Sequence, residues 1–438
     1  MAKMQDQFGV STFVLILALG LAACSPVADE GTDVTDAVGG LEGQSAVVFD
    51  VPTCATVSAG AVERTEYSAH GGGATFEEPL AIETVGTVHR LPETYPDDWL
   101  IIHDANFDSM IDGRFIIFDP AAEHHGFKSS IHAGKLGGVD VAPERNEIYV
   151  ATTYYSRGIS GIRTDIISVH DMCTLEKKAE LEIPSGLSET TPFKNKFRLS
   201  NDDRFGFAYN FTPASSVTVV NVDQLSVLNQ VDIPGCSLAY PMGARSFASV
   251  CGDGTMLGSQ LDENGNVLSQ TRTDSVIDFD ANAMFMKPAR FNDEIYFPTF
   301  RGDLHGFDLS GEQPTHLGTW SLISDEDRES GWRPGGWTLI AADPVDGELY
   351  VLMHPDGQEG THKNPGTEIW VFDIETKERK RRMPLELPAI SIVATQQFIV
   401  ATNVNMELDV YDAASGALSR AIGQTAMTPF VVYTAAGQ

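Results

Sequence analysis

The sequence has few basic residues. Its 438 residues include 29 Lys and Arg against 61 Asp and Glu, so the formal net charge is −32. Phosphate backbones repel a chain of this charge, and we therefore expect no nucleic acid among its partners. The plain interpretation of the charge is solubility in a salty or crowded compartment.

Familiar catalytic and ligand-binding patterns are missing as well. The sequence has no Gly-x-Ser-x-Gly elbow and no phosphate-binding glycine fingerprint, and no Cys or His pair has the spacing of a zinc site. We therefore expect no metal, no cofactor and no catalytic residue on this chain. A chain of this length without its own chemistry suggests a scaffold for a partner.

Long apolar runs are scarce, and the one that stands out lies near the N-terminus. FVLILALGLAAC, residues 13–24, has the length of a signal peptide and is too short to predict a membrane span. Its last four residues resemble a bacterial lipobox, in which the cysteine becomes the lipidated first residue. We predict a signal peptide over 1–23, lipidation of Cys24 and a location in the periplasm, anchored to the outer membrane. The alternative is an ordinary secretory signal cut near Ala23.

Cysteine is rare, with five in the chain. If Cys24 is lipidated, Cys54, Cys173, Cys236 and Cys251 remain, and an exported compartment permits disulfides. Cys236 and Cys251 lie on two strand-like pieces joined by a Pro-Met-Gly turn, which favours their pairing. Cys54 with Cys173 is then a second disulfide by elimination, although nothing local supports it.

Helical periodicity is almost absent after a Gly-, Asp-, Thr- and Ala-rich stretch, 24–45, that indicates a flexible tether. Instead, an alternating strand that ends in aspartate recurs seven times, at intervals of 39 to 65 residues. The aspartates are Asp119, Asp171, Asp223, Asp262, Asp308, Asp373 and Asp412. An aspartate in this place can bond the backbone two residues on and start a turn, so we interpret these residues as turn formers.

Units of about 40 to 50 residues with four strands each predict an all-β, seven-bladed β-propeller. We place it over residues 99–438, with 46–98 as an N-terminal arm for which no structure is predicted. TPFVVYT, residues 428–434, follows the last repeat and is expected to close the ring by joining the first blade.

The longest interval contains an insertion of about 20 residues with two loops, GWRPGGW (331–337) and HPDGQEGTHKNPG (354–366). Glycine permits close backbone approach, and Pro334 stiffens the first loop. Long loops on a rigid scaffold often bind partners. We predict that the first loop packs as a connection and contacts a partner through Trp332, Arg333 and Trp337, with one of the tryptophans stacked near Arg333.

From about Trp99 to the C-terminus, the chain resembles the heavy subunit of methylamine and aromatic amine dehydrogenases. The resemblance is carried by YNFTPASSVTVVNVD, the Cys236–Cys251 segment ending in CGDG, SDEDRESGWRPGGW and MHPDGQEGTHKNPGTEIWVFD. The HPDG and EGTHK pieces are closer to the aromatic-amine branch. The lipobox and the stretch before Trp99 depart from the family pattern.

The resemblance implies a seven-bladed propeller that serves as the large, non-catalytic subunit of a periplasmic amine dehydrogenase. Two heavy and two light chains form such an enzyme, and the light subunit carries tryptophan tryptophylquinone. It oxidises primary amines to aldehyde and ammonia and passes electrons to a copper protein such as azurin or amicyanin.

The resemblance also assigns residues. The segment HDANFDSMIDGRFIIFD places the phenylalanine that shapes the substrate channel at Phe107, and the family disulfide falls on Cys236 and Cys251. Trp332 and Trp337 are not expected to form a quinone. The alternative function is a propeller lipoprotein of the same descent that binds other molecules without a light subunit. A lactonase-like propeller hydrolase ranks last, because no metal ligands converge in the repeat.

Overall fold

The structure is a computed structural model that describes residues 46–49, 90–343 and 345–436. The chain separates into two units, residues 1–40 and 41–438, and every described residue belongs to the second. The predicted signal peptide and tether, together with Cys24 and Cys54, lie outside the described residues, as does most of the N-terminal arm.

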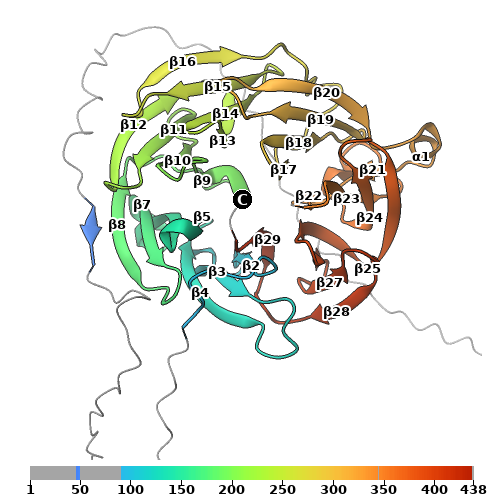
Figure 1. The fold of residues 1–438 in the computed structure, drawn as a ribbon, viewed down its shortest axis with the longest axis horizontal. Coiled ribbons are helices and arrows are strands. Elements are labelled where there is room, and N and C mark those ends of the chain that lie inside the picture. Colours follow the sequence, from blue (N-terminus) through green and yellow to red (C-terminus); the bar gives the residue numbers. More distant parts are fainter. Residues whose placement is uncertain (1–45, 50–89, 344, 437–438) are drawn as a thin grey trace, which may run out of the picture. The chain divides into compact units, whose positions relative to one another are not determined.

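The described strands form antiparallel sheets set around a central axis, as in a β-propeller (Figure 1). Four-stranded sheets have the orders β29 (Pro429–Thr434), β2 (Leu100–Asp104), β3 (Gly113–Phe118), β4 (Phe127–Gly134); β9 (Phe197–Leu199), β10 (Phe205–Asn210), β11 (Ser216–Asn221), β12 (Ser226–Asp232); β13 (Cys236–Met242), β14 (Ser246–Cys251), β15 (Met256–Leu261), β16 (Val267–Arg272); and β17 (Ala289–Phe291), β18 (Glu294–Pro298), β19 (Asp303–Asp308), β20 (Thr315–Ser321). The five-stranded sheet has the order β5 (Gly138–Ala142), β6 (Glu147–Arg157), β7 (Ser160–Asp171), β8 (Lys177–Ile183), β1 (Val47–Val48).

The remaining strands form one sheet of eight: β21 (Arg333–Pro334), β22 (Ile340–Ala342), β23 (Glu348–His354), β24 (Gly366–Asp373), β25 (Arg379–Ala394), β26 (Phe398–Asn403), β27 (Leu408–Asp412) and β28 (Leu418–Ile422). The helices are short: α1 (Asp325–Glu329), η1 (Met110–Asp112), η2 (Pro143–Arg145), η3 (Lys194–Lys196) and η4 (Thr361–Lys363).

The propeller fold is confirmed, but the expected seven separate blades are not found. Five blades are separate sheets, and the last strands merge into the eight-stranded sheet. The reason is the length of β25, which has 16 residues. Its first part pairs with β24 and its last part, from Ala389, pairs with β26, so the hydrogen-bonded ladder continues where other sheets stop.

Large apolar side chains fill the space between neighbouring sheets. The rings of Phe207 on β10 and Phe247 on β14 lie 5.2 Å apart, and those of Tyr240 on β13 and Phe297 on β18 lie 5.3 Å apart. All four side chains are fully buried, at 0% exposure. Each sheet therefore buries its faces on its neighbours, which is why the alternating pattern recurs around the ring.

Closure uses the last strand, as predicted. β29 pairs antiparallel with β2, from Leu100 opposite Thr434 to Asp104 opposite Pro429. The buried carboxylate of Asp104 accepts hydrogen bonds from the backbone N–H groups of Met427 and Thr428 at 3.0 and 2.8 Å. The two ends of the propeller sequence are thus joined by a ladder and by one buried acid.

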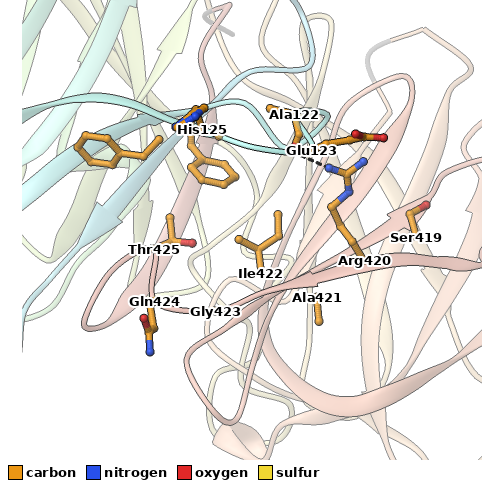
Figure 2. A pocket seen from close by; sticks show the side chains of 13 residues that line it. Ala122, Glu123, His125, Ser419, Arg420, Ala421, Ile422, Gly423, Gln424 and Thr425 are labelled. Carbon is orange, nitrogen blue, oxygen red and sulfur yellow. Dashed lines mark hydrogen bonds between the residues drawn. The ribbon is translucent and has the colours of Figure 1, made fainter. Parts of the chain in front are cut away.

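A cavity of about 900 Å³ lies beside this closure, between the connection from β3 to β4 and strand β28 (Figure 2). Arg420 crosses it and donates from Nη1 to the carbonyl oxygen of Ala122 at 2.6 Å. Phe118 and Ile422 line its apolar part. None of the residues predicted for a site lines this cavity, and it does not enter the candidate site.

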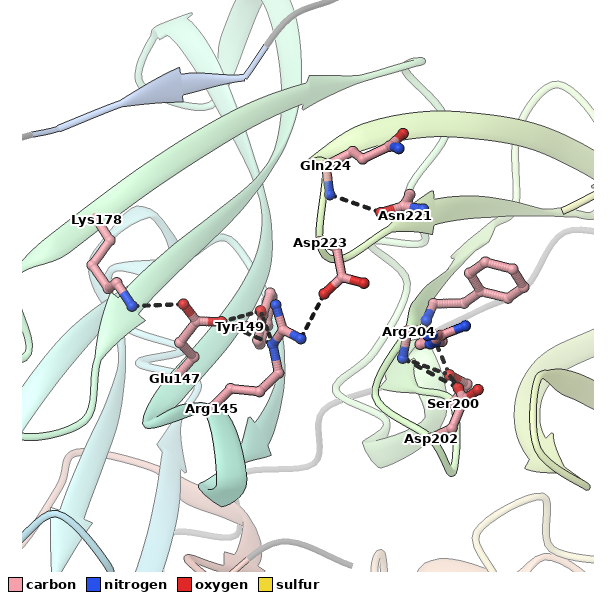
Figure 3. A network of polar contacts seen from close by, with 11 residues as sticks. Arg145, Glu147, Tyr149, Lys178, Ser200, Asp202, Arg204, Asn221, Asp223 and Gln224 are labelled. Carbon is pink, nitrogen blue, oxygen red and sulfur yellow. Dashed lines mark hydrogen bonds and ion pairs between the residues drawn. The ribbon is translucent and has the colours of Figure 1, made fainter. Parts of the chain in front are cut away.

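Six of the seven repeating aspartates start turns, as predicted. Their carboxylates accept hydrogen bonds from backbone N–H groups two or three residues further on, at 2.7 to 3.0 Å; these are Asp119, Asp171, Asp262, Asp308, Asp373 and Asp412. Asp223 is the exception. It accepts from Arg145 of the neighbouring sheet at 2.7 Å, and Asn221 holds the turn through the N–H of Gln224 (Figure 3).

Strand direction divides the connections between two ends of the propeller. Since neighbouring strands are antiparallel, the links from second to third strand and from fourth strand to the next sheet lie at the same end. This end carries the long connections 184–196, 273–288, 322–339 and 355–365. We call it the elaborated face, and the opposite end, with the aspartate turns, the turn face.

Candidate functional site

The segment GWRPGGW is a tightly packed connection on the elaborated face. It follows α1, whose N-terminus is closed by a capping box between Ser324 and Asp327. Arg333 and Pro334 pair with His354 and Met353 as β21. The segment is thus tied to the other long loop, which starts at the end of β23.

The two central glycines are required by close approach. A Cβ atom on Gly335 would lie 2.5 Å from Cδ2 of His354 and 2.7 Å from the carbonyl oxygen of Asn364. Gly336 has φ +124°, and a Cβ there would lie 2.8 Å from the carbonyl oxygen of Ile390. No other residue type fits these positions without displacing backbone.

The predicted stacking of Arg333 on a neighbouring tryptophan is wrong. The Arg333 guanidinium lies over Phe300, 4.7 Å from the ring centroid, because β21 turns the side chain toward the β18–β19 connection. Trp332 packs instead against Trp370, with ring centroids 5.3 Å apart, and Arg382 covers it at 4.4 Å. Trp332 therefore belongs to the packing of the eight-stranded sheet.

Trp337 leads to a row of aromatic rings. Its ring lies 5.1 Å from that of Phe430 and 6.1 Å from that of Phe193, and Phe430 in turn lies 5.0 Å from Phe107. The Nζ atom of Lys287 sits 3.1 Å from the centroid of the Trp337 ring. We call Phe107, Phe430, Trp337, Phe193 and Lys287 the aromatic row.

The row is anchored at its central ring and is open at the Phe107 end. The indole Nε1 of Trp337 donates to the carbonyl oxygen of Pro192 at 3.1 Å, which fixes the central ring. Phe107, at the open end, is 42% exposed and meets Phe430 edge to face. A role for Phe107 in core packing at a blade edge does not agree with this exposure.

Only Phe107 and Trp337 of the row were predicted from the sequence. Phe193, Lys287 and Phe430 were missed because they lie in three different connections or strands: 184–196, 273–288 and β29. No local motif marks them. The ring arrangement alone brings them together on the elaborated face.

Lys287 of the row and Lys194 beside it both have a lowered pKa. Burial, and then the charge of Lys363, lower the pKa of Lys287 to about 7. Burial, and then the charge of Arg198, lower the pKa of Lys194 to about 7, and its Nζ lies 5.6 Å from the centroid of the Tyr433 ring. The aromatic rings thus lie beside two lysines whose pKa is lowered to about 7.

The arrangement offers binding surface and no assembled catalytic set. In the ranges that the structure describes, no group of three or more His, Cys, Asp or Glu side chains is placed to hold a metal ion. The same ranges contain no helix long and apolar enough to cross a bilayer. What the row can do is accept an apolar or aromatic group and limit its approach.

The cysteines lie away from the row. Cys236 and Cys251 form a disulfide between the directly paired ends of β13 and β14. Cys173 is also disulfide-bonded. Its proposed partner, Cys54, is outside the described residues, so that pairing remains a prediction.

Comparison with known proteins gives a consistent result. The family description "Methylamine dehydrogenase heavy chain (MADH)" matches residues 100–436. The methylamine dehydrogenase heavy chain of Methylophilus methylotrophus is 27% identical over 309 residues, covering 69% of this chain and 76% of that one. The heavy chain of Methylobacillus flagellatus is 25% identical over 378 residues, covering 84% of this chain and 94% of the relative.

Among solved structures, a candidate 6-phosphogluconolactonase from Bacteroides fragilis is similar with a TM-score of 0.50 and 10% identity. The similarity covers 76% of this chain and 96% of that protein, and at this identity it concerns the fold alone. The family match, by contrast, spans every sheet of the propeller. The chain belongs to the methylamine dehydrogenase heavy chain family.

Proposed function

We propose that this chain is the large, non-catalytic subunit of a periplasmic amine dehydrogenase that oxidises primary amines to aldehyde and ammonia. The observation that carries the proposal is the family match over residues 100–436. A heavy chain implies a light chain, and in this proposal the light chain carries tryptophan tryptophylquinone. Two chains of each kind form the complex, and a copper protein such as azurin or amicyanin takes the electrons.

In this proposal Phe107 narrows the substrate channel where the light chain meets the elaborated face. Its exposure leaves the ring free to contact a partner, and Phe430 and Trp337 support it from behind. A supported ring has fewer rotamers available, so it can exclude amines by size. The quinone would supply the oxidation chemistry. The residues of this chain would bind the amine, orient it and exclude amines of the wrong size.

The location of the complex is part of the proposal. Lipidation of Cys24 after removal of residues 1–23 would attach the heavy chain to the outer membrane, with 24–45 as the tether. An acylated N-terminus followed by this tether would hold the propeller near the membrane.

The experiment starts from the assembled complex. The chain is purified in mild detergent with its light chain, and amine-dependent dye reduction is measured for methylamine and for an arylalkylamine. Phe107→Ala should change the ratio of kcat/KM for the two amines by about tenfold or more, since a lost pocket contact is worth about 1–3 kcal/mol.

Phe127→Ala is the matched control, because Phe127 lies on the same sheet, is 52% exposed and is not part of the row. An unchanged ratio in Phe107→Ala would refute the channel role. Failure of any light chain to join the wild-type protein, together with no amine-dependent activity, would refute the subunit role and favour the scaffold alternative.

A further inference from the structure

One hairpin on the elaborated face is much longer than the others. β6 and β7 have 11 and 12 residues, and their pairing continues through Thr153 opposite Asp165 to Arg157 opposite Ser160. The second and third strands of the four-stranded sheets have five or six residues. Residues 153–164 therefore extend past the sheet, and we call them the long hairpin.

The base of the long hairpin is held rigidly by a buried acid. Asp165 is fully buried and accepts from the hydroxyl of Thr153 at 2.7 Å and from the N–H groups of Gly186 and Leu187 at 2.7 and 2.9 Å. Arg163 also donates to both of its oxygens at 2.9 Å. Burial alone would raise the pKa of Asp165, but these donors hold it below its ordinary value.

These contacts join the hairpin to the aromatic row. Gly186 and Leu187 belong to the connection 184–196, which also carries Phe193. The hydroxyl of Tyr155 donates to Glu189 of the same connection at 2.5 Å. A fixed base means that little conformational entropy is lost when the hairpin binds something.

The tip of the hairpin, in contrast, is apolar and uncovered. Ile159 is 70% exposed and Ile162 is 76% exposed, and they stand on either side of Gly161, which has φ +101°. Isoleucine is among the residue types most often found buried. Two isoleucines on a rigid projection indicate a contact surface rather than a solvent-facing turn.

Other exposed apolar side chains gather at the same end. The connections of the elaborated face carry Phe107, Ile111, Ile159, Phe211, Val404 and Met427, all at least 42% exposed. They come from three consecutive sheets and from the adjoining β26–β29 part of the ring. In the described connections of the turn face, Val345 is the comparably exposed apolar residue. The long hairpin is thus one part of an apolar arc that includes the open end of the row.

We propose that the long hairpin is an arm that grips the light chain through Ile159 and Ile162. This inference rests on the proposed function. The light chain is the occupant that this chain's family requires, and the arc is continuous through Phe107 with the surface assigned to the substrate channel. The hairpin fixes the orientation of the light chain over the aromatic row, and the apolar tip supplies binding energy.

The test uses the full chain and the light chain released from the purified wild-type complex. The light chain is titrated onto the heavy chain, and Kd is measured by the bound fraction in size-exclusion chromatography. The double variant with Ile159→Ser and Ile162→Ser should raise Kd at least about tenfold. Truncating a side chain that dominates an interface commonly weakens binding by more than this factor. Val345→Ser, 59% exposed on the turn face, should change Kd less than about twofold.

Both variants alter exposed positions, so their denaturant midpoints should match the wild type, which separates lost binding from lost folding. Amide exchange of residues 153–164 should slow when the light chain is added. An unchanged Kd in the double variant would overturn the proposed arm while the subunit role stands. The same holds if the double variant keeps its Kd for the light chain but loses self-association or binding to lipid vesicles. A wild-type chain that forms no complex would overturn both.

Discussion

Gly335 offers a direct test of how the elaborated face is built. In Gly335→Ala the new methyl carbon would start 2.5 Å from Cδ2 of His354 and 2.7 Å from the carbonyl oxygen of Asn364. Neither neighbour can move freely. His354 is 2% exposed and its Nδ1 is 2.9 Å from the carbonyl oxygen of Pro355, while the second contact is backbone. Overpacking of this kind lowers the free energy of unfolding by about 1–3 kcal/mol, and we expect a decrease near the upper end of this range.

The assay is equilibrium unfolding in guanidinium chloride, with the free energy of unfolding compared at a common slope. Gly311→Ala is the control: the nearest atom to its added Cβ is 3.8 Å away, and its φ is not in the left-handed region. We expect a change within about 0.5 kcal/mol there. If Gly335→Ala were as stable as Gly311→Ala, the two long loops would not be packed as described, and the support for Trp337 would fail with them.

Three further predictions address charge, the hairpin base and the disulfide. Because the folded pKa of Lys287 is about 7 and its ordinary value 10.5, the unfolded chain binds the extra proton between these values. From pH 7 to pH 9 Lys287 should therefore raise the free energy of unfolding by up to about 1.4 kcal/mol per pH unit, and Lys287→Met should show a smaller rise than the wild type, since Lys194 contributes in the same direction in both proteins. Equal rises in the two proteins between pH 7 and pH 9 would contradict this prediction. Asp165→Asn should lower the free energy of unfolding by about 2 kcal/mol or more and speed proteolysis within 153–164, since hydrogen bonds to a charged carboxylate are lost. Cleavage at the wild-type rate would argue against a rigid hairpin base. Replacing Cys236 and Cys251 by serine removes a disulfide that spans 15 residues and should lower the free energy of unfolding by about 3 kcal/mol. Thermal unfolding without reductant measures this loss, and a variant as stable as the wild type would exclude a stabilising role.

Local patterns were sufficient for much of the fold. Alternating strands, a repeat of about 40 to 50 residues and aspartates at strand ends predict a propeller, because each depends on neighbours in sequence. The closing strand could also be predicted, since an apolar strand after the last repeat has only the first blade to join. Asp223 shows the limit of this reasoning. Asn221 and Asp223 can each cap the same turn, and Arg145, from another sheet, decides between them.

The number of separate sheets and the make-up of the site depend on tertiary structure. The sequence of β25 does not indicate that its first part pairs with β24 while its last part pairs with β26. This double pairing merges the last strands into one sheet. Likewise, Phe193, Lys287 and Phe430 meet Trp337 only because the ring closes and brings distant connections to one end. The sequence alone determined the kind of fold and the family, through short-range chemistry that repeats. The aromatic row was decided by packing, because its contacts join residues far apart in the chain.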